Sequence, residues 1–371
     1  MAARTDIDVL VVGLGPAGAE AARAAADQGL RVLAIERNAR PGEPVQCAEF
    51  VPMMIGMDMP DLGDSLIQPI GEMQSFLPGE AVETTADFRG RMVDRARFDR
   101  HLIARAQAAG AECRFASPLQ ALAPDGTAQL QSGARIRARA VIGADGPRSR
   151  VGAAIGAVNA DLVESRQITV ALNAPHAATD IYLHPDIVGG YAWLFPKGDQ
   201  ANLGLGVAAA EKARLKPLLD GLHAQLVAEG RIGAAPLRHT GGAIPVGGIT
   251  GPVGRLGDTA VFLAGDAAGL VNPVTGAGIP AAVLSGRMAG LAAAAHASGD
   301  ADALADYAEE IDDTFGASLS HALARRRALL ATYRTGSQPG PDDLRRGWIA
   351  FPQYWTRDAS PAREMEALPA S

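Results

Sequence analysis

Short apolar runs that end in glycine-rich turns mark the start of the chain. Residues 8–12 are apolar after an initial aspartate, which is typical of a strand buried on both faces of a sheet. An alanine-rich helix is expected to follow, ending at Gly29, and residues 31–36 predict the next strand. The chain therefore opens with a strand–helix–strand unit of the kind that joins parallel strands.

The same patterns predict the rest of the chain in outline. From residue 167 to 207, short apolar runs alternate with polar and glycine-rich turns, which indicates an antiparallel meander. Its expected strands are 168–172, 180–183, 191–195 and 202–207. The other expected elements are helices at 50–57, 96–109 and 212–228, strand-like pieces within 70–92, strands at 136–142 and 259–264, and a mostly helical section from 279.

The apolar segment from 267 to 299 raises the question of a membrane span, because Arg287 is its only acidic or basic residue apart from one histidine. A span needs roughly 20 predominantly apolar residues. This segment instead contains Asn272, Pro273 and Pro280 among many glycines. We therefore expect a loop followed by a buried helix.

The turn after the first strand carries a spaced set of glycines. Gly13 permits a tight turn, Gly15 lets a pyrophosphate approach the backbone, and Gly18 allows close packing of the helix. Free N–H groups at the helix start favour an anion, and Glu36, at the end of the next strand, can accept from ribose hydroxyls. This context predicts dinucleotide binding, but the pattern alone does not separate FAD from NAD.

Three further motifs follow along the chain. Asp266 comes directly after a buried strand and can accept from a ribityl hydroxyl, and a glycine-rich loop at 276–278 opens the next helix toward a developing anion. Asp145 follows another strand in an Ala-Asp-Gly turn. Arg95 begins a helix, where the helix dipole disfavours positive charge. We therefore expect a phosphate or a ring to hold Arg95.

In this order the four motifs resemble the glutathione-reductase-type FAD fold, in its hydroxylase and geranylgeranyl reductase branch, over roughly residues 6 to 300. The resemblance implies an α/β fold with a discontinuous Rossmann-type FAD-binding domain, an antiparallel β-sheet substrate domain and a helical C-terminal section. The expected boundaries are 1–65, 93–158 and 240–300 for the FAD-binding domain, 66–92 and 159–239 for the substrate-binding domain, and 301–371 for the C-terminal section. The expected FAD-binding residues are Gly13, Gly15, Pro16, Ala17, Gly18, Glu36, Arg37, Arg95, Asp145, Gly265, Asp266, Gly276, Ala277 and Gly278.

Three aromatic residues, Tyr191, Trp193 and Phe195, alternate along one expected strand and so share a face. Their Tyr-x-Trp-x-Phe-Pro pattern resembles the signature that lines the isoprenoid cavity of geranylgeranyl reductases. That family often has a proline three residues before the tyrosine. Here the position is Val188, so the two glycines that follow would supply the bend. The alternatives are a substrate-binding wall and a plain core face.

Cys47 lies in the loop after the second strand, and geranylgeranyl reductases carry a similar cysteine near the flavin, often in Cys-Gly-Glu where this chain has Cys-Ala-Glu. Cys47 and Glu49 are the candidate catalytic residues, as donors of a proton to the substrate. The alternative for Cys47 is an inert buried thiol. Cys113, on an expected strand, is interpreted as core, and no metal site is expected.

The resemblance implies an FAD-dependent oxidoreductase that reduces carbon–carbon double bonds of a small apolar, isoprenoid substrate by hydride transfer from reduced flavin. The main alternative is an FAD-dependent monooxygenase that hydroxylates an aromatic or alkene substrate, or a protein side chain. A redox-silent FAD-binding module is a third. The sequence shows no second dinucleotide motif, so we expect NADPH to bind transiently or a reduced ferredoxin-like protein to supply electrons.

Composition and charge bear on the binding partners and on the cellular compartment. The net charge is −7, which argues against a general nucleic-acid binder, and two cysteines with no secretory signal favour the cytoplasm. Near the end of the chain, Arg325, Arg326 and Arg327 precede several aromatics, including Trp348 and Trp355. Such an end could rest on the inner face of a membrane as a peripheral contact. The favoured alternative is a solvated basic face beside an aromatic clasp on the main body.

Overall fold

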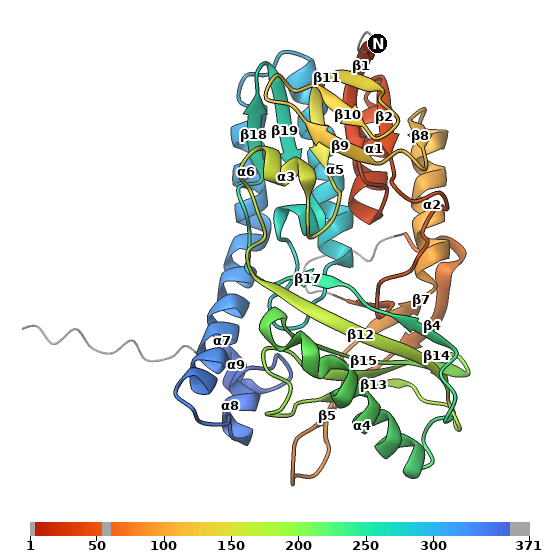
Figure 1. Ribbon diagram of the computed structural model, residues 1–371, viewed down its shortest axis with the longest axis vertical. Helices are drawn as coiled ribbons and strands as arrows, with labels where there is room; N and C mark the ends of the chain where they lie inside the picture. Colours follow the sequence, from red (N-terminus) through yellow and green to blue (C-terminus); the bar gives the residue numbers. More distant parts are fainter. Residues whose placement is uncertain (1–3, 54–60, 357–371) are drawn as a thin grey trace, which may run out of the picture.

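The computed structural model describes residues 4–53 and 61–356. They form a mostly parallel sheet covered by helices, in the upper part of Figure 1, and an antiparallel sheet below it. A long helix, α7 (Ala317–Arg334), runs down one side toward the lower sheet. The expected α/β fold, with a parallel sheet, an antiparallel sheet and a helical C-terminal section, is confirmed.

The upper sheet is built from parallel, buried strands. Its order is β18-β19-β11-β1-β2-β8, in which β1 pairs in parallel with β2 and β11, and β18 forms an antiparallel edge. The strands are β1 (Arg4–Val12), β2 (Val32–Ile35), β8 (Glu112–Arg114), β11 (Arg135–Gly143), β18 (Val253–Leu256) and β19 (Thr259–Leu263), with β9 (Leu119–Leu122) and β10 (Ala128–Leu130) attached to β11. Helix α2 (Arg95–Ala108) leads into β8, and α3 (Arg150–Ala154) follows β11.

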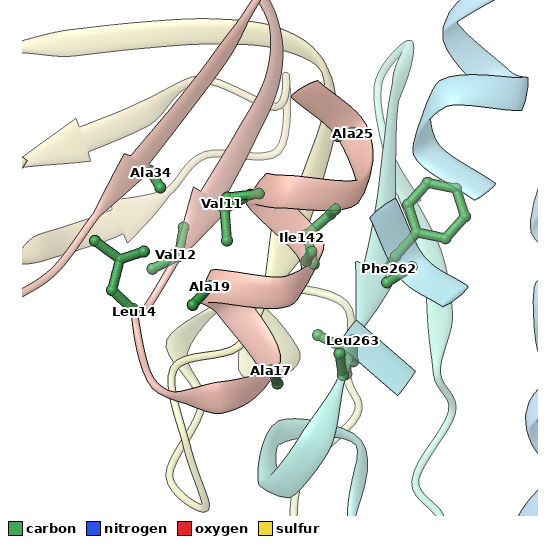
Figure 2. Close-up of a cluster of buried hydrophobic side chains, with 14 of the residues drawn as sticks. Val11, Val12, Leu14, Ala17, Ala19, Ala25, Ala34, Ile142, Phe262 and Leu263 are labelled. Carbon is green, nitrogen blue, oxygen red and sulfur yellow. The ribbon is translucent and has the colours of Figure 1, made fainter. Parts of the chain in front are cut away.

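Alanine side chains let α1 (Pro16–Asp27) lie close to this sheet. Figure 2 shows Ala17 and Ala19 of the helix among buried strand residues such as Val11 and Ile142. All four belong to one continuous hydrophobic core. The strand–helix–strand unit expected at the start of the chain is confirmed.

Helix α5 (Ile279–Ala297) crosses α1 at very short distance. A Cβ atom added at Gly286 would lie 2.1 Å from the carbonyl oxygen of Ala17, and one at Gly290 would lie 2.5 Å from that of Ala21. Real side chains do not approach backbone oxygens so closely. The crossing therefore requires glycine on α5, and it holds the first half of α1 against the middle of α5.

The apolar segment from 267 to 299 contains a loop and then α5, as expected. Among the helices that the structure describes, none combines the length and the hydropathy needed to cross a bilayer.

The lower sheet has the order β16-β12-β15-β14-β13-β5-β6, and α4 (Leu215–Ala228) packs on its outer face. β13, β14 and β15 form the expected meander, but β12 pairs with β15 instead of β13. That part of the prediction is wrong because β12 and β15 are the two longest strands here, and pairing them satisfies the most backbone groups. The strands are β5 (Glu72–Phe76), β6 (Glu83–Thr85), β12 (Leu162–Ala171), β13 (Ala178–Tyr182), β14 (Ala192–Lys197), β15 (Gln200–Ala208), β16 (Arg238–Thr240) and β17 (Ala243–Pro245), the last paired with β12.

A small third sheet joins β3 (Phe50–Pro52), β7 (Gly90–Val93) and β4 (Leu66–Ile70). The expected helix at 50–57 is therefore wrong over β3, and residues 54–60 lie outside the described part. The physical reason is local, because an aromatic, a valine and a proline favour a strand over a helix interior. The other expected helices and strands appear within a few residues of their predicted bounds.

Up to residue 356, the C-terminal section contains α6 (Ala303–Ile311), a π-helical turn (Asp312–Gly316), α7, α8 (Pro341–Arg346) and α9 (Pro352–Trp355). Its aromatic side chains turn inward, since Trp348, Phe351 and Tyr354 are almost completely buried. Trp355 is 65% exposed. The aromatic clasp on the main body is confirmed.

The basic run before the clasp is not a solvated face. Arg325 and Arg326 are 5% and 6% exposed, and Arg327 alone of the three is exposed. Arg325 donates to the carbonyl of Tyr354 at 2.9 Å, and Arg326 donates to the carbonyl of Gly189. Both guanidinium groups hold α7 to its neighbours, so that part of the interpretation is wrong.

Gly286→Ala should lower the free energy of unfolding by about 1–3 kcal/mol, the usual cost of forcing an extra group into a packed core. Its Cβ has no room beside Ala17. The matched control is Gly221→Ala in α4, where a Cβ meets nothing within 4 Å. That change should stabilise by about 0.5–1 kcal/mol. Chemical denaturation measures both, and equal effects would contradict the tight crossing.

Candidate active site

One continuous cavity of about 1360 Å³ opens between the upper and lower sheets. It is lined at one end by the glycine turn after β1 and at the other by the aromatic side chains of β14 and the C-terminal clasp. Single-ligand pockets usually measure about 300–1,000 Å³. The cavity therefore has room for a cofactor and a substrate together.

The three glycines of the first turn differ in the space around them. Gly13 has φ +96°, and a Cβ there would lie 2.3 Å from the Ala144 carbonyl oxygen. A Cβ at Gly18 would lie 1.8 Å from the carbonyl oxygen of Gly13. At Gly15 a Cβ meets nothing within 4 Å, although this residue lines the cavity. Gly13 and Gly18 therefore close the turn, and Gly15 leaves an open approach to the backbone.

The ends of two helices face this approach. Gly15 caps α1 and Gly278 caps α5, and neither helix start receives a hydrogen bond from a capping side chain. Gly276 and Ala277 line the cavity beside Gly278. Two helix N-termini with free N–H groups thus give this end of the cavity a positive potential suited to phosphate or to a negatively charged ring.

Glu36 lies at the end of β2, where its carboxylate braces the glycine turn. It accepts from the backbone N–H of Leu14 at 3.0 Å and of Asn38 at 2.9 Å. Each oxygen has a second lone pair, and the side chain lines the cavity. Glu36 is thus positioned to accept from a ribose, and Arg37 lines the same stretch at the surface.

Asp266 follows β19 and lines the cavity. No described residue donates a hydrogen bond to its carboxylate. Burial raises the pKa of Asp266 to about 6, and the Arg95 guanidinium pulls that pKa back toward its ordinary value. The protein therefore keeps an unsatisfied acceptor here, of the kind that a ribityl hydroxyl would complete.

Arg95 and Asp145 are occupied by protein groups. The Arg95 guanidinium forms two parallel hydrogen bonds to Asp99, at 2.9 and 3.1 Å, while its side chain still borders the cavity. Asp145 accepts from the Ser149 hydroxyl and from the backbone N–H of Arg150, at 2.7 Å for the latter. Asp99 thus holds Arg95 at the start of α2, and a contact of Arg95 with a phosphate or a ring stays a prediction. Asp145 shapes its own turn beside the cavity.

Cys47 and Glu49 lie on one short segment between the two sheets, but in different surroundings. The Cys47 thiol lines the cavity, and burial raises its pKa, while the Arg95 guanidinium pulls that pKa down. Glu49 is fully buried with φ +67°, and it does not line the cavity. Its backbone N–H contacts the Cys47 sulfur at 3.2 Å.

The Glu49 carboxylate accepts hydrogen bonds from four donors. The N–H of Arg95 lies 3.1 Å from Oε1, and Lys197 and Asn202 lie 2.7 and 3.0 Å from Oε2, with Arg238 at 3.4 Å. Sequence reasoning missed these partners, because they come from α2, β14, β15 and β16. The only local signal was that Asn202 and Lys197 are polar residues near or within buried strands.

The aromatic residues Tyr191, Trp193 and Phe195 line the cavity on one face of β14 and its approach. The Tyr191 ring packs against Trp348 of the clasp, with ring centroids 4.6 Å apart, and its hydroxyl donates to the carbonyl of Thr275 at 2.6 Å. Thr275 belongs to the glycine-rich loop before α5. These three residues, called the aromatic wall below, therefore form both a packed core and a cavity surface. Through Thr275 the aromatic wall contacts the end of the cavity that is lined by the glycine turn and the starts of α1 and α5, called the cofactor end below.

The bend before this wall depends on the two glycines. Gly189 has φ +73°, and a Cβ at Gly190 would lie 2.1 Å from the Gly206 carbonyl oxygen. Both positions therefore require glycine. Cys113 is half-buried and packs against the core of the upper sheet, away from the cavity residues.

Known proteins resemble this chain in sequence and in fold. The geranylgeranyl reductase catalytic domain model matches residues 163–234, and a lycopene cyclase protein model matches residues 8–172. Digeranylgeranylglycerophospholipid reductase 2 of Methanopyrus kandleri is 36% identical over 293 residues, which cover 71% of this chain and 70% of that protein. The chain belongs to the geranylgeranyl reductase family. It is an FAD-dependent oxidoreductase, as the sequence predicted.

Solved structures agree with this assignment. A geranylgeranyl bacteriochlorophyll reductase-like protein from Thermoplasma acidophilum superposes with a TM-score of 0.77 and 27% identity, covering 89% of this chain and 88% of that chain. PqsL from Pseudomonas aeruginosa, in complex with 2-aminobenzoylacetate, has a TM-score of 0.66 at 21% identity, covering 88% of this chain and 96% of that chain. At that identity it shares the fold alone.

The geometry of this geranylgeranyl reductase family member fits FAD. The open side of Gly15 and the two uncapped helix starts suit a pyrophosphate, Glu36 suits a ribose, and the unsatisfied Asp266 suits a ribityl chain. The individual contacts remain predictions. Arg95 and Asp145 would act on FAD from positions that Asp99 and Ser149 already fix.

Gly15→Val should leave the apoprotein folded but prevent FAD binding, because the branched side chain would fill the open approach to the backbone. Gly18→Val is the matched control and should destabilise the apoprotein itself, since its Cβ meets Gly13. Thermal unfolding of the apoprotein and flavin absorbance after gel filtration separate the two effects. A Gly15→Val protein that stays yellow would refute the assignment.

Asp266→Asn should stabilise the apoprotein and weaken FAD binding. The folded state binds the Asp266 proton more tightly than the unfolded chain, whose ordinary pKa is 3.8. Wild-type apoprotein should therefore lose stability as the pH rises from about 4 to 6, and the variant should lack this slope. At neutral pH we expect a gain of about 1–3 kcal/mol in unfolding free energy, and FAD affinity roughly ten- to hundredfold lower.

Denaturation of the apoprotein across this pH range, with FAD titration at neutral pH, tests both parts. An unchanged pH slope would show that Asp266 is not the titrating group. Unchanged FAD affinity would place the ribityl chain elsewhere.

Proposed function

We propose that this protein reduces carbon–carbon double bonds of an apolar, isoprenoid substrate of the geranylgeranyl type. The observation that carries the proposal is the hydrogen bond from Tyr191 to Thr275, which joins the aromatic wall to the loop of the cofactor end. A chain lying on that wall would have its double bonds beside the flavin. The Methanopyrus kandleri relative, a digeranylgeranylglycerophospholipid reductase by name, supports the same substrate class.

The aromatic wall supplies binding and alignment. Trp193 and Phe195 are 6% and 5% exposed, and with Tyr191 and Trp348 they give a long apolar surface at the substrate end. Such a surface binds an isoprenoid chain by excluding water. Bound FAD, once reduced, supplies the hydride. The protein's task is therefore to hold one double bond in place and keep water out.

Cys47 is the proton donor that the geometry favours. Its thiol lines the cavity and has a raised pKa, so it stays protonated at neutral pH and can give its proton to the second alkene carbon. Glu49 faces away from the cavity and is bound by four donors, which suits it to hold the Cys47 segment. We assign Cys47 the transfer and Glu49 the positioning.

The electrons come from an external donor in this proposal. The sequence carries one glycine motif for a dinucleotide, which FAD would use. NADPH that binds transiently, or a reduced ferredoxin-like protein, would then reduce the flavin. Stopped-flow mixing of the oxidised holoenzyme with each donor tells them apart by the rate at which the flavin absorbance bleaches.

Anaerobic mixing of dithionite-reduced holoenzyme with geranylgeranyl diphosphate should restore the oxidised flavin spectrum and give a product with two more hydrogen atoms. The Cys47→Ala variant should bind FAD normally but reoxidise roughly a hundredfold or more slowly, within the range for loss of a general acid. Flavin that stays reduced until oxygen is admitted would overturn the reductase proposal and favour the monooxygenase. Unimpaired Cys47→Ala would remove the thiol from the mechanism.

A further inference from the structure

Facing residues of β12, β15 and β14 form a row across the lower sheet, on the side toward the cavity. In one row Gln167 is paired with Gly204, and Gly204 is paired with Trp193. Gln167 and Trp193 both line the cavity, and Gln167 is only 3% exposed. A buried primary amide in such a position requires hydrogen-bond partners.

Gly204 leaves a gap through which the indole crosses the middle strand. A Cβ at Gly204 would lie 2.5 Å from the Trp193 ring, so any other residue would push the indole away. With glycine there, the indole N–H of Trp193 reaches across β15 and donates to Oε1 of Gln167 at 2.9 Å. This reach is longer than the usual contact between neighbouring strands.

The other side of the same amide holds the cysteine segment. Nε2 of Gln167 donates to the carbonyl of Cys47 at 3.2 Å and to the hydroxyl of Thr240 at 3.1 Å. The indole is a donor only, so Oε1 must face Trp193. Nε2 must then face the Cys47 carbonyl, which is an acceptor only. The chemistry of the two partners therefore allows one orientation of the amide.

We infer that Gln167 is a positioning residue that ties the backbone of Cys47 to the indole of Trp193. The inference rests on the proposed function, in which Trp193 holds the substrate chain and Cys47 gives a proton. The amide fixes the distance between these two groups. A substrate that seats against the indole thereby meets the thiol in a set position, although Gln167 itself transfers nothing.

The link from Trp193 through Gln167 to Cys47 is separate from the hydrogen bonds that hold Glu49. Asn202 donates to the carbonyl of Ala48 at 3.2 Å and to Glu49, one row further along the sheet. Thr169 in turn donates to the Asn202 side-chain oxygen at 3.0 Å. The Cys47 segment would therefore stay attached to the lower sheet when Gln167 is replaced. What is lost is the coupling to Trp193.

The test measures the reactivity of Cys47 in the FAD-bound enzyme, in a Cys113→Ser background so that a single thiol reports. Gln167→Leu should raise the rate of alkylation by iodoacetamide by roughly three- to tenfold, as expected when a neutral hydrogen bond is lost. Trp193→Phe, which keeps an aromatic ring but lacks the N–H, should raise it similarly. The double variant should be no faster than Gln167→Leu alone, because both changes break one link.

Thr240→Val is the matched control, since it removes the remaining hydrogen bond of the amide and leaves both ends of the link. Its alkylation rate should equal that of the parent. The inference is overturned if Trp193→Phe reacts at the parental rate, if the two effects multiply, or if Thr240→Val matches Gln167→Leu. Should Gln167→Leu fail to fold, the comparison of Trp193→Phe with Thr240→Val decides alone.

Turnover separates this inference from the proposed function. In the anaerobic assay Gln167→Leu should lower the maximal rate of alkene-dependent reoxidation with little change in KM, because the apolar wall remains. A raised KM at unchanged maximal rate would assign Gln167 to binding and overturn its positioning role. If wild-type enzyme reduces no alkene, the proposed function fails, while alkylation still reports on the link.

Discussion

The buried carboxylate of Glu49 is the interaction on which the two halves of this enzyme depend. An unpaired charge in such a place would be strongly destabilising, so the partners of Glu49 are obligatory. One partner is the first backbone N–H of α2, and the others are side chains of β14, β15 and β16 in the lower sheet. The segment that carries Cys47 is therefore fixed both to α2 and to the lower sheet. The backbone of Glu49 is left-handed, at φ +67°. A non-glycine residue keeps this conformation only when its surroundings impose it.

The two ends of the cavity differ in how far their own groups are satisfied without a ligand. The cofactor end leaves polar groups without protein partners, notably the Asp266 carboxylate and the starts of α1 and α5. A ligand would complete these groups, whose unmet hydrogen bonds otherwise weaken a folded protein, as in many binding sites where stability and function oppose each other. The substrate end is satisfied without a ligand, since its aromatic side chains pack on one another and on the clasp. With FAD and an isoprenoid bound as proposed, cofactor specificity would come from unmet hydrogen bonds, and substrate specificity from shape.

The sequence was informative wherever chemistry follows from local spacing. The glycine turn, the alternating aromatics and the apolar helix after residue 279 each depend on neighbours within a few positions, and the family resemblance named the cofactor. Long-range pairing was the limit. Nothing near Glu49 indicates Lys197 or Arg238, and nothing near β12 indicates that it pairs with β15. The helix expected at residue 50 was wrong for a local reason, since the residues at 50–52 favour a strand, and the partner of that strand, β7, lies far away in the sequence.

The clasp has a consequence for how such an enzyme can diversify. Arg345 on α8 is fixed to Glu80 and Glu83 of the β5–β6 hairpin, and Trp348, a few residues on, closes the substrate end against Tyr191. The β5–β6 hairpin and the segment from α8 to Trp348 therefore brace the substrate end of the cavity together. In evolution, cofactor binding and substrate choice could therefore change independently. The core around the glycine turn could be kept unchanged, while changes at Trp348 and its neighbours on the clasp would alter which chains fit.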